Sequence, residues 1–339
     1  MKKIIYLGGL YQAEYSLRID FLENDVEMLF LIEENPFGIG YWNGTVHSTY
    51  KTYPFVKLIA PGELEEFLKK YAPDVIIHRF YKSDPLMHYE ASEIAKRLGI
   101  PYVILKMETT GSDTLKDLDN YKSDAVLYAH NYDARLLQSL SQNIYFYPYG
   151  VSSFERSYPE IRKDRNIGAF GLFRGYTERI ENIEMFLEGI IALGEKLHVY
   201  EASELSWKYV DKKYLPYLEI HPKFYQDETS YEMARYKIIV NIESLWHVEE
   251  MYSHKLFQSV GCGVPTLTFY KKSLESLFWE SLNPVFVSNS DEVARVIKYF
   301  LSHEEVRERN GFNGERFVHE KYGWYSRFSD IMKKENIWK

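Results

Sequence analysis

Two segments in the second half of the chain combine positive charge with a glycine or a helix start. The first contains Gly171, Arg174 and Arg179, and the second contains Ser253, His254 and Lys255. A bound diphosphate needs backbone N–H groups, a helix N-terminus and a cation, and these residues can supply all three without a metal ion. The glycines Gly261 and Gly263 add a turn at which the backbone can approach a ligand closely. The pattern therefore predicts a diphosphate site that does not depend on a metal.

Polar residues also follow an apolar run in that half, at 236–242. Asn241 lies at the end of the run, Glu243 comes directly after it, and Glu249 and Glu250 form an acidic pair further on. Ligands of parallel sheets bind at the carboxyl ends of the strands, so these residues are candidates for contact with a ligand. A helix cap explains Glu243 equally well, and a plain acidic loop explains the pair.

In the first half, two glycines and a histidine follow apolar runs. Gly8 and Gly9 come after the first run, where a phosphate or an acceptor molecule can approach, although a tight turn needs them equally. His78 comes directly after the buried run 73–77 and is a candidate catalytic residue. A histidine at a strand end is more often part of a hydrogen-bonded structure.

Short apolar runs alternate with amphipathic segments along the chain. In the first half, strands are predicted at 3–7, 26–32, 73–77, 100–105, 123–128 and 144–147, and helices at 11–23, 61–71 and 89–98. In the second half, strands are predicted at 166–173, 196–200, 237–242 and 265–269, and helices at 177–193, 228–236, 253–260, 290–301 and 304–322. Continuous apolar strands separated by helices predict parallel sheets that are covered on both faces.

A segment rich in proline, glycine and serine, 148–159, separates the two alternations and is typical of a linker. The length of 339 residues also favours two domains. We therefore expect the first domain to end near residue 150.

Charge and composition exclude several classes of function. The chain has 41 basic and 49 acidic residues, a net charge of −8, whereas proteins that bind a nucleic-acid backbone are usually basic. The single cysteine, Cys262, cannot form an internal disulfide. Neither a signal peptide nor a run of about 18 apolar residues occurs. We expect a cytoplasmic protein with no transmembrane segment and no strong nucleic-acid signal, while peripheral membrane contact stays open.

Several common motifs are missing from the sequence. The first strand is not followed by Gly-x-Gly-x-x-Gly, and there is no Walker loop, His-Glu-x-x-His or cysteine pair. Dehydrogenases, mononucleotide hydrolases and zinc enzymes therefore have no support. Asp117 and Asp119 form an Asp-x-Asp pattern, but they precede an apolar strand rather than follow one. No metal site is predicted.

The runs 236–244 and 249–267 place a set of residues in a recurring order. The set is Asn241, Lys255, Phe257, Gln258 and the turn 261–265. This order resembles the donor-sugar site of GT-B glycosyltransferases, most closely the CgeB-like group near retaining family four. Segments 170–179, 283–293 and 311–328 also resemble that group in order and spacing. The likeness covers about 168–332, and over 1–150 it is only architectural.

The resemblance implies an α/β fold of GT-B architecture, with two Rossmann-like doubly wound domains that face each other across a cleft. It implies an acceptor-binding domain over 1–150, a donor-binding domain over 151–315, and a C-terminal helix over 316–339 that packs back on the first domain. The implied activity is transfer of a sugar from a UDP- or GDP-linked nucleotide diphosphate sugar to an acceptor hydroxyl, retaining, metal-independent and without a cofactor. The acceptor is then a glycan, glycolipid or protein, as in polysaccharide or glycoconjugate biosynthesis.

The resemblance also implies roles for single residues. In that group a Glu at the place of Gln258 binds the ribose hydroxyls, and a Glu at the place of Glu250 lies near the transferred sugar. An amide has one acceptor oxygen where a carboxylate has two, so Gln258 predicts weaker ribose binding or a degenerate site. Glu108 follows the strand after which retaining enzymes place a His or an acid, and it is a candidate catalytic residue. Arg179 and Lys255 would neutralise the leaving diphosphate.

Two other functions remain open. Glu243-Ser244 followed by 253–256 is also similar to a stretch of α1,3-fucosyltransferases, although His254 stands where those enzymes have Glu. That similarity implies an inverting enzyme that uses a GDP-sugar. A non-catalytic nucleotide-sugar-binding protein is the third candidate, because Gln258 and the missing first-domain His depart from the catalytic pattern.

Overall fold

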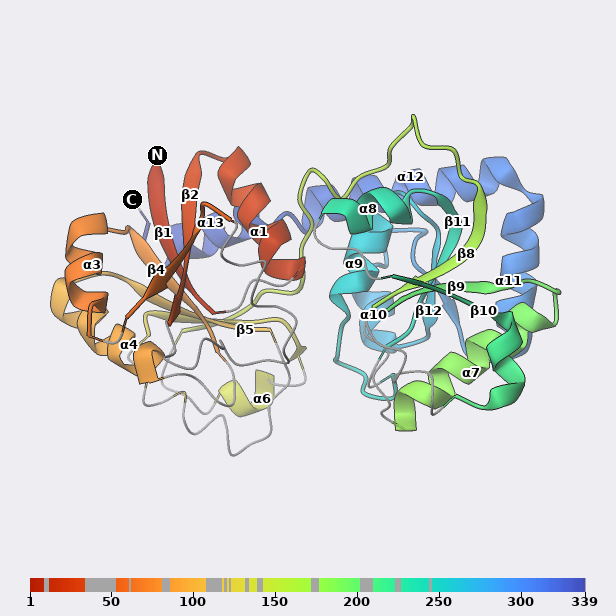
Figure 1. The fold of residues 1–339 in the computed structure, drawn as a ribbon, viewed down its shortest axis with the longest axis horizontal. Coiled ribbons are helices and arrows are strands. Elements are labelled where there is room, and N and C mark those ends of the chain that lie inside the picture. Colours follow the sequence, from red (N-terminus) through yellow and green to blue (C-terminus); the bar gives the residue numbers. More distant parts are fainter. Residues whose placement is uncertain are drawn as a thin grey trace. The chain divides into compact units, whose positions relative to one another are not determined.

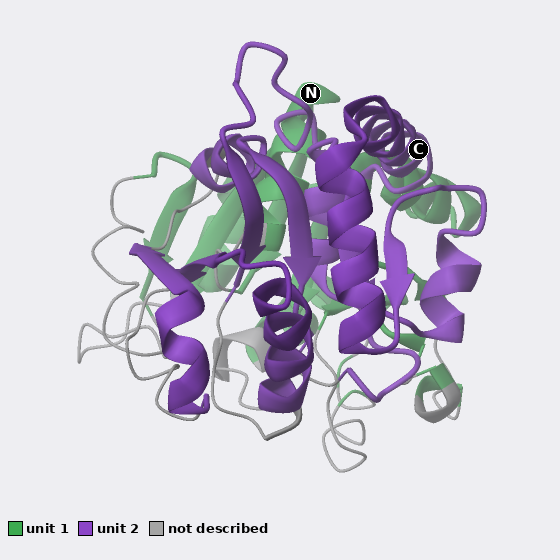
Figure 2. Ribbon diagram, turned by 90° about the vertical axis from the view of Figure 1, so that its right-hand side faces the viewer, with its two compact units in different colours: residues 1–148, 324–339 green, residues 149–323 purple. Residues whose placement is uncertain are grey.

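The structure is a computed structural model that divides into two compact units (Figure 2). It describes residues 1–8, 12–33, 53–60, 62–80, 86–107, 118, 121, 123–131, 134–138, 143–171, 177–201, 210–222, 227–243 and 246–338. Unit 1 consists of Met1–Pro148 and Trp324–Lys339, and unit 2 of Tyr149–Gly323. The domain borders expected at 150 and 315 lie two and eight residues from these divisions.

Unit 1 is built on a parallel sheet of seven strands in the order β3-β2-β1-β4-β5-β6-β7. The strands are β1 (Lys2–Leu7), β2 (Val26–Glu33), β3 (Val56–Ile59), β4 (Val75–Arg79), β5 (Tyr102–Lys106), β6 (Ala125–Tyr128) and β7 (Ile144–Phe146). The helices of the unit are α1 (Gln12–Glu23), α3 (Leu64–Tyr71), α4 (Leu86–Leu98), α6 (Ala134–Leu137) and α13 (Trp324–Lys334). The central strands β4 and β5 are buried along their whole length, as expected for a sheet covered on both faces.

Unit 2 repeats this design with six parallel strands in the order β10-β9-β8-β11-β12-β13 (Figure 1). The strands are β8 (Arg165–Phe170), β9 (Leu197–Glu201), β10 (Leu218–Pro222), β11 (Tyr236–Asn241), β12 (Thr266–Phe269) and β13 (Val285–Val287). The helices are α7 (Thr177–Ile191), α8 (Asp227–Met233), α9 (His254–Gly261), α10 (Lys272–Leu277), α11 (Ser290–Ser302) and α12 (Glu304–Lys321), with a 3₁₀ helix η4 (Lys212–Tyr217).

Both sheets have the strand order of a Rossmann fold, which confirms the predicted α/β class. The chain enters each sheet in the middle, runs to one edge and then continues on the other side. The order reverses between β1 and β4 in unit 1, and between β8 and β11 in unit 2. Ligands of such sheets bind outside the carboxyl ends of the strands at this switch point. The residues that follow these four strands are therefore the candidates for contact with a ligand.

The segment expected to be a linker, 148–159, is largely part of unit 2. Val151, Ser152 and Glu155 are buried, and the backbone N–H of Ser157 donates to Glu315 Oε1 at 2.9 Å. The proline and serine content of this segment therefore indicates irregular backbone structure and not a flexible linker.

The C-terminal helix α13 belongs to unit 1, as predicted. Its Trp324 is completely buried, and the indole N–H donates to Ser16 Oγ on α1 at 3.0 Å. The ring of Phe328 packs on Phe21 with centroids 5.1 Å apart. The backbone N–H of Tyr325 donates to Asp20 Oδ2 at 2.6 Å. Within the described part of the chain, no helix is long and apolar enough to cross a membrane.

We expect Trp324→Phe to lower the free energy of unfolding by about 1–3 kcal/mol, because it removes the bond to Ser16 and leaves a void in a close-packed interior. Denaturant unfolding measures the change. Trp279 is 76% exposed, so Trp279→Phe is the matched control and should change stability by less than about 0.5 kcal/mol. Equal losses for the two variants would contradict the docking of α13.

Candidate functional site

Four polar side chains meet at the carboxyl ends of β11 and β12 in unit 2. Asn241 is the last residue of β11, and its Nδ2 donates to Glu243 Oε1 at 3.2 Å and to Thr268 Oγ1 at 3.1 Å. Lys271, two residues after β12, forms an ion pair with Glu243 Oε2. The sequence predicted Asn241 and Glu243 here but missed Lys271. We call Asn241, Glu243, Thr268 and Lys271 the strand-end cluster.

The strand-end cluster is buried and electrostatically coupled. Glu243 is 5% and Lys271 1% exposed. Burial raises the pKa of Glu243, whereas Lys271 and the hydrogen bond from Asn241 oppose that rise. Lys271 Nζ also donates to the carbonyl of Met251 at 3.1 Å, which holds the 246–253 segment against the cluster. The ion pair of Glu243 and Lys271 is therefore a buried, fixed polar contact at the ends of β11 and β12.

The first turns of α7 contribute two further groups. Asn182 is buried, and its Nδ2 donates to the carbonyl of Glu243 at 3.4 Å. Its Oδ1 has no hydrogen-bond partner among the described residues, so it offers an acceptor beside the cluster. The predicted Arg179 is partly buried and lies three positions earlier, on the same face of the helix. The sequence did not single out Asn182, although its spacing from Arg179 is a usable signal.

Each sheet has a glycine directly after its first strand. Gly171 follows β8 with φ +148°, and a Cβ built there would meet no atom of the described residues within 4 Å. Gly8 follows β1 with φ +140°, and a Cβ there would lie 2.9 Å from Cβ of Arg79. Both conformations favour glycine. The room above Gly171 agrees with the close approach of a ligand, whereas Gly8 is needed for packing against Arg79.

The predicted residues at the start of α9 interact inside unit 2. Ser253 is the N-cap residue, without a side-chain cap bond. His254 Nε2 lies 3.7 Å from Oε1 of the buried Glu155. Lys255 Nζ donates to Gln258 Oε1 at 2.8 Å, and Gln258 Nε2 donates to Ser230 Oγ at 3.1 Å. Gln258 is fully buried, so its two polar atoms are engaged in the interior and its ribose-binding role stays a prediction.

The acidic pair before α9 divides into two different environments. Glu249 is exposed, and its Oε2 accepts from the backbone N–H of Ser273 at 3.3 Å. Glu250 is partly buried, four residues before α9 begins at His254. The contact with α10 favours a positional role for Glu249 and leaves Glu250 as the candidate for contact with a sugar.

Comparisons with known proteins give one family match and a set of similar solved structures. Residues 179–333 match the sequence model of a family described as Glycosyl transferase-like. No curated protein is significantly similar in sequence. Among solved structures, HepE from Anabaena in complex with UDP and glucose is 12% identical, with a TM-score of 0.69 over 98% of this chain and 99% of that chain. The chain has the GT-B fold.

Other solved structures of the GT-B fold are equally distant in sequence. A mutant of S. aureus TarM in complex with fondaparinux, alpha-GlcNAc-glycerol and UDP is 11% identical, with a TM-score of 0.67 over 99% of this chain and 100% of that chain. Sucrose-phosphate synthase from Thermosynechococcus elongatus is 10% identical, with a TM-score of 0.64 over 98% and 99%. At these identities the likeness concerns the fold alone.

In unit 1 of this GT-B fold, His78 has no exposed surface. It lies near the end of β4 with ring centroids 5.0 Å from Tyr121, 5.8 Å from Tyr102 and 6.1 Å from Phe80. These ring contacts differ from the hydrogen-bonded role that the sequence analysis gave as the alternative, and the catalytic role stays a prediction. The next residue, Arg79, forms a buried ion pair with Glu14 of α1 at the switch point. The sequence analysis missed this pair.

Three predicted site residues lie outside the described residues. They are Gly9, Glu108 and Arg174. The Asp117 and Asp119 pattern also falls there. The predicted donor-site residues that the structure describes are all in unit 2: Gly171, Arg179, Asn241, Glu243, Ser253, His254, Lys255 and Gln258.

Proposed function

We propose that this chain is a glycosyltransferase that moves a sugar from a nucleotide diphosphate sugar to an acceptor hydroxyl. The observation that best supports the proposal is that the family match includes the polar site at the strand ends. The match to the Glycosyl transferase-like family starts at Arg179 and includes β11 and β12, whose carboxyl ends carry the strand-end cluster. A fold alone would not specify an activity, whereas this polar site lies where sheets of this class bind ligands.

We propose UDP as the nucleotide of the donor. The solved structures of HepE and TarM, which share the fold, contain UDP. In this chain the diphosphate would lie between Gly171 and the first turn of α7, with Arg179 and Lys255 as the cations. Asn182 Oδ1, buried without a partner among the described residues, and the partly buried Glu250 would accept hydrogen bonds from hydroxyl groups of the donor.

The proposed reaction depends on positioning and on neutralisation of charge. As the bond between sugar and diphosphate breaks, negative charge grows on the leaving phosphate, and a fixed guanidinium and ammonium group stabilise it. We propose that protein cations rather than a metal ion do this, and that the anomeric configuration is retained. Unit 1 would bind the acceptor, a glycan, glycolipid or protein, with Gly8, Gly9, His78 and Glu108 as its candidate residues.

We expect UDP to stabilise the protein against heat more than GDP, CDP, dTDP or ADP. A ligand that binds only the folded state adds RT ln(1 + [L]/Kd) to the free energy of unfolding, so UDP at about 100 times its Kd should raise Tm by about 4 °C in a chain of this length. A thermal-shift panel with and without EDTA measures this, and EDTA should leave the UDP shift unchanged.

The other outcomes of that panel separate the alternatives. A shift with GDP alone would favour the fucosyltransferase-like enzyme, and loss of the UDP shift in EDTA would contradict metal independence. Incubation with UDP-sugars, followed by measurement of UDP release and of the product anomer, then tests catalysis. Binding of UDP without any turnover would instead indicate a nucleotide-sugar-binding protein.

A further inference from the structure

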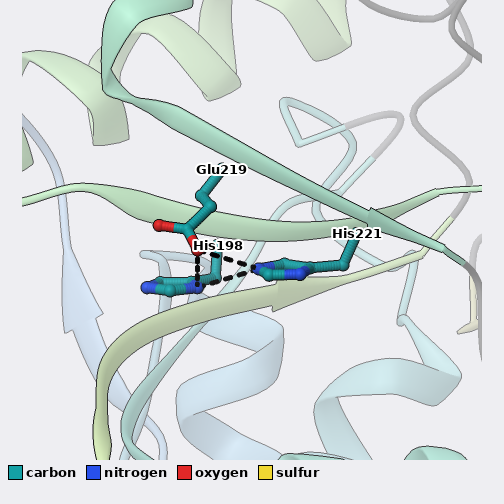
Figure 3. A group of neighbouring side chains, drawn as sticks. All are labelled: His198, Glu219 and His221. Carbon is teal, nitrogen blue, oxygen red and sulfur yellow. Dashed lines mark hydrogen bonds and ion pairs between the residues drawn. The ribbon is translucent and has the colours of Figure 1, made fainter.

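Three potential metal ligands lie together on one face of the sheet edge in unit 2, away from the strand-end cluster. His198 belongs to β9, and Glu219 and His221 belong to the edge strand β10. The register pairs Glu219 with His198, and residues two apart on a strand share a face. Figure 3 shows the three side chains converging from the two neighbouring strands.

The three potential ligand atoms, one from each side chain, form a triangle of the size that a zinc ion requires. His198 Nδ1 lies 3.0 Å from His221 Nε2, and Glu219 Oε1 lies 3.8 Å from the first nitrogen and 3.7 Å from the second. Tetrahedral Zn²⁺ with bonds of about 2.0–2.2 Å holds its ligand atoms roughly 3.3 Å apart. The observed separations lie within about 0.5 Å of this value, so small side-chain rotations would bring all three atoms to the metal.

The two imidazoles lie close together at this edge of the sheet. Both rings are partly buried and stack in parallel with centroids 5.2 Å apart. Arg165, on the adjacent strand β8, is ion-paired with Glu232. Without a metal, one imidazole N–H can donate to the other ring, which also explains the 3.0 Å distance.

We propose that His198, Glu219 and His221 bind one Zn²⁺ ion, with a water molecule as the fourth ligand. Two imidazoles and a carboxylate form a ligand set that zinc accepts. The ion would link β10 to β9 and so protect a strand that is otherwise poorly packed, since Glu219, Ile220 and Pro222 are all exposed. This site is structural and separate from the proposed donor site, so it is independent of the proposed activity.

We expect the full chain, stripped with EDTA and desalted, to bind one equivalent of Zn²⁺ when titrated with the metal alone against a chromophoric chelator. His221→Ala and Glu219→Gln should each raise the Kd for Zn²⁺ by more than about a hundredfold. Loss of a group that only hydrogen-bonds to a metal ligand already costs about 10- to 100-fold, and here a ligand itself is lost. Co²⁺ offers a second readout, since a tetrahedral site gives it strong visible absorption that both variants should lose.

His303→Ala is the control, because His303 is an exposed histidine of the same unit whose ring contacts Tyr299. It should bind Zn²⁺ as the parent chain does. Glu219 is exposed, so Glu219→Gln tests the site without risk to the fold. No saturable binding by the parent chain, or binding by Glu219→Gln and His221→Ala as tight as that of the parent chain, would overturn the proposal. The UDP shift should be the same in these variants, which separates this test from that of the proposed function.

Discussion

Replacing Lys271 by Met should lower the free energy of unfolding by about 3–5 kcal/mol, because it leaves the carboxylate of Glu243 buried without its partner. Both side chains are nearly inaccessible, so water cannot replace the lost ammonium group. The neighbouring Lys272 is exposed, and Lys272→Met should change stability by less than about 0.5 kcal/mol. Urea unfolding of the two variants measures the difference.

The loss in Lys271→Met should depend on pH with a definite sign. Without Lys271 the pKa of Glu243, already raised by burial, rises further. Between the unfolded pKa, about 4.3, and this raised value, the folded state binds a proton that the unfolded state lacks, so stability falls as pH rises. The deficit should therefore be largest near pH 7 and shrink towards about pH 5. A deficit that does not change with pH would show that the unpaired carboxylate is not its cause.

A second substitution checks the same point without a change of pH. Adding Glu243→Leu to Lys271→Met removes the unpaired charge, and most of the lost stability should return, because replacing a whole buried ion pair is often close to neutral. If the double variant is as unstable as the single one, packing around Lys271 matters more than its charge.

The sequence predicts the central strands well and the sheet edges poorly. Strands β1, β4, β5, β8 and β11 each contain a continuous buried run of mainly apolar residues, because both faces of the sheet are covered there. The edge strand β10 reads Leu-Glu-Ile-His-Pro, and β3 has only four residues. Edge strands are short and half polar, so their pattern matches a loop, and both were missed.

The candidate site shows a similar limit: the sequence does not reveal which residues contact each other in the folded chain. Asn241 and Glu243 were predicted because they end an apolar strand. Lys271 also follows a strand end, but it pairs with a residue 28 positions earlier, and only the sheet brings the two together. Gln258 was assigned to a ligand from motif position, whereas α9 directs it into the interior. Spacing therefore locates the site, and packing decides which atoms face it.

Loss of both proposed phosphate ligands, Arg179→Ala with Lys255→Ala, should lower kcat by about 10³- to 10⁴-fold, because removing one donor to a growing negative charge costs about 10²–10³. KM should change less, since the charge to be stabilised is greater in the transition state than in the bound donor. Steady-state UDP release from the UDP-sugar that supports turnover measures both constants.

The outcome must be separated from damage to the fold, because Lys255 also supports the buried Gln258. The control is Arg295→Ala with Lys298→Ala, an exposed pair of the same residue types on α11 of the same unit. It should keep the parent rate, and unfolding curves should show that both double variants are folded. A folded Arg179→Ala, Lys255→Ala protein that transfers sugar at the parent rate would place the diphosphate elsewhere. A fall in kcat with unchanged unfolding would instead tie the two cations to the departing phosphate, since a purely structural role would lower stability together with activity.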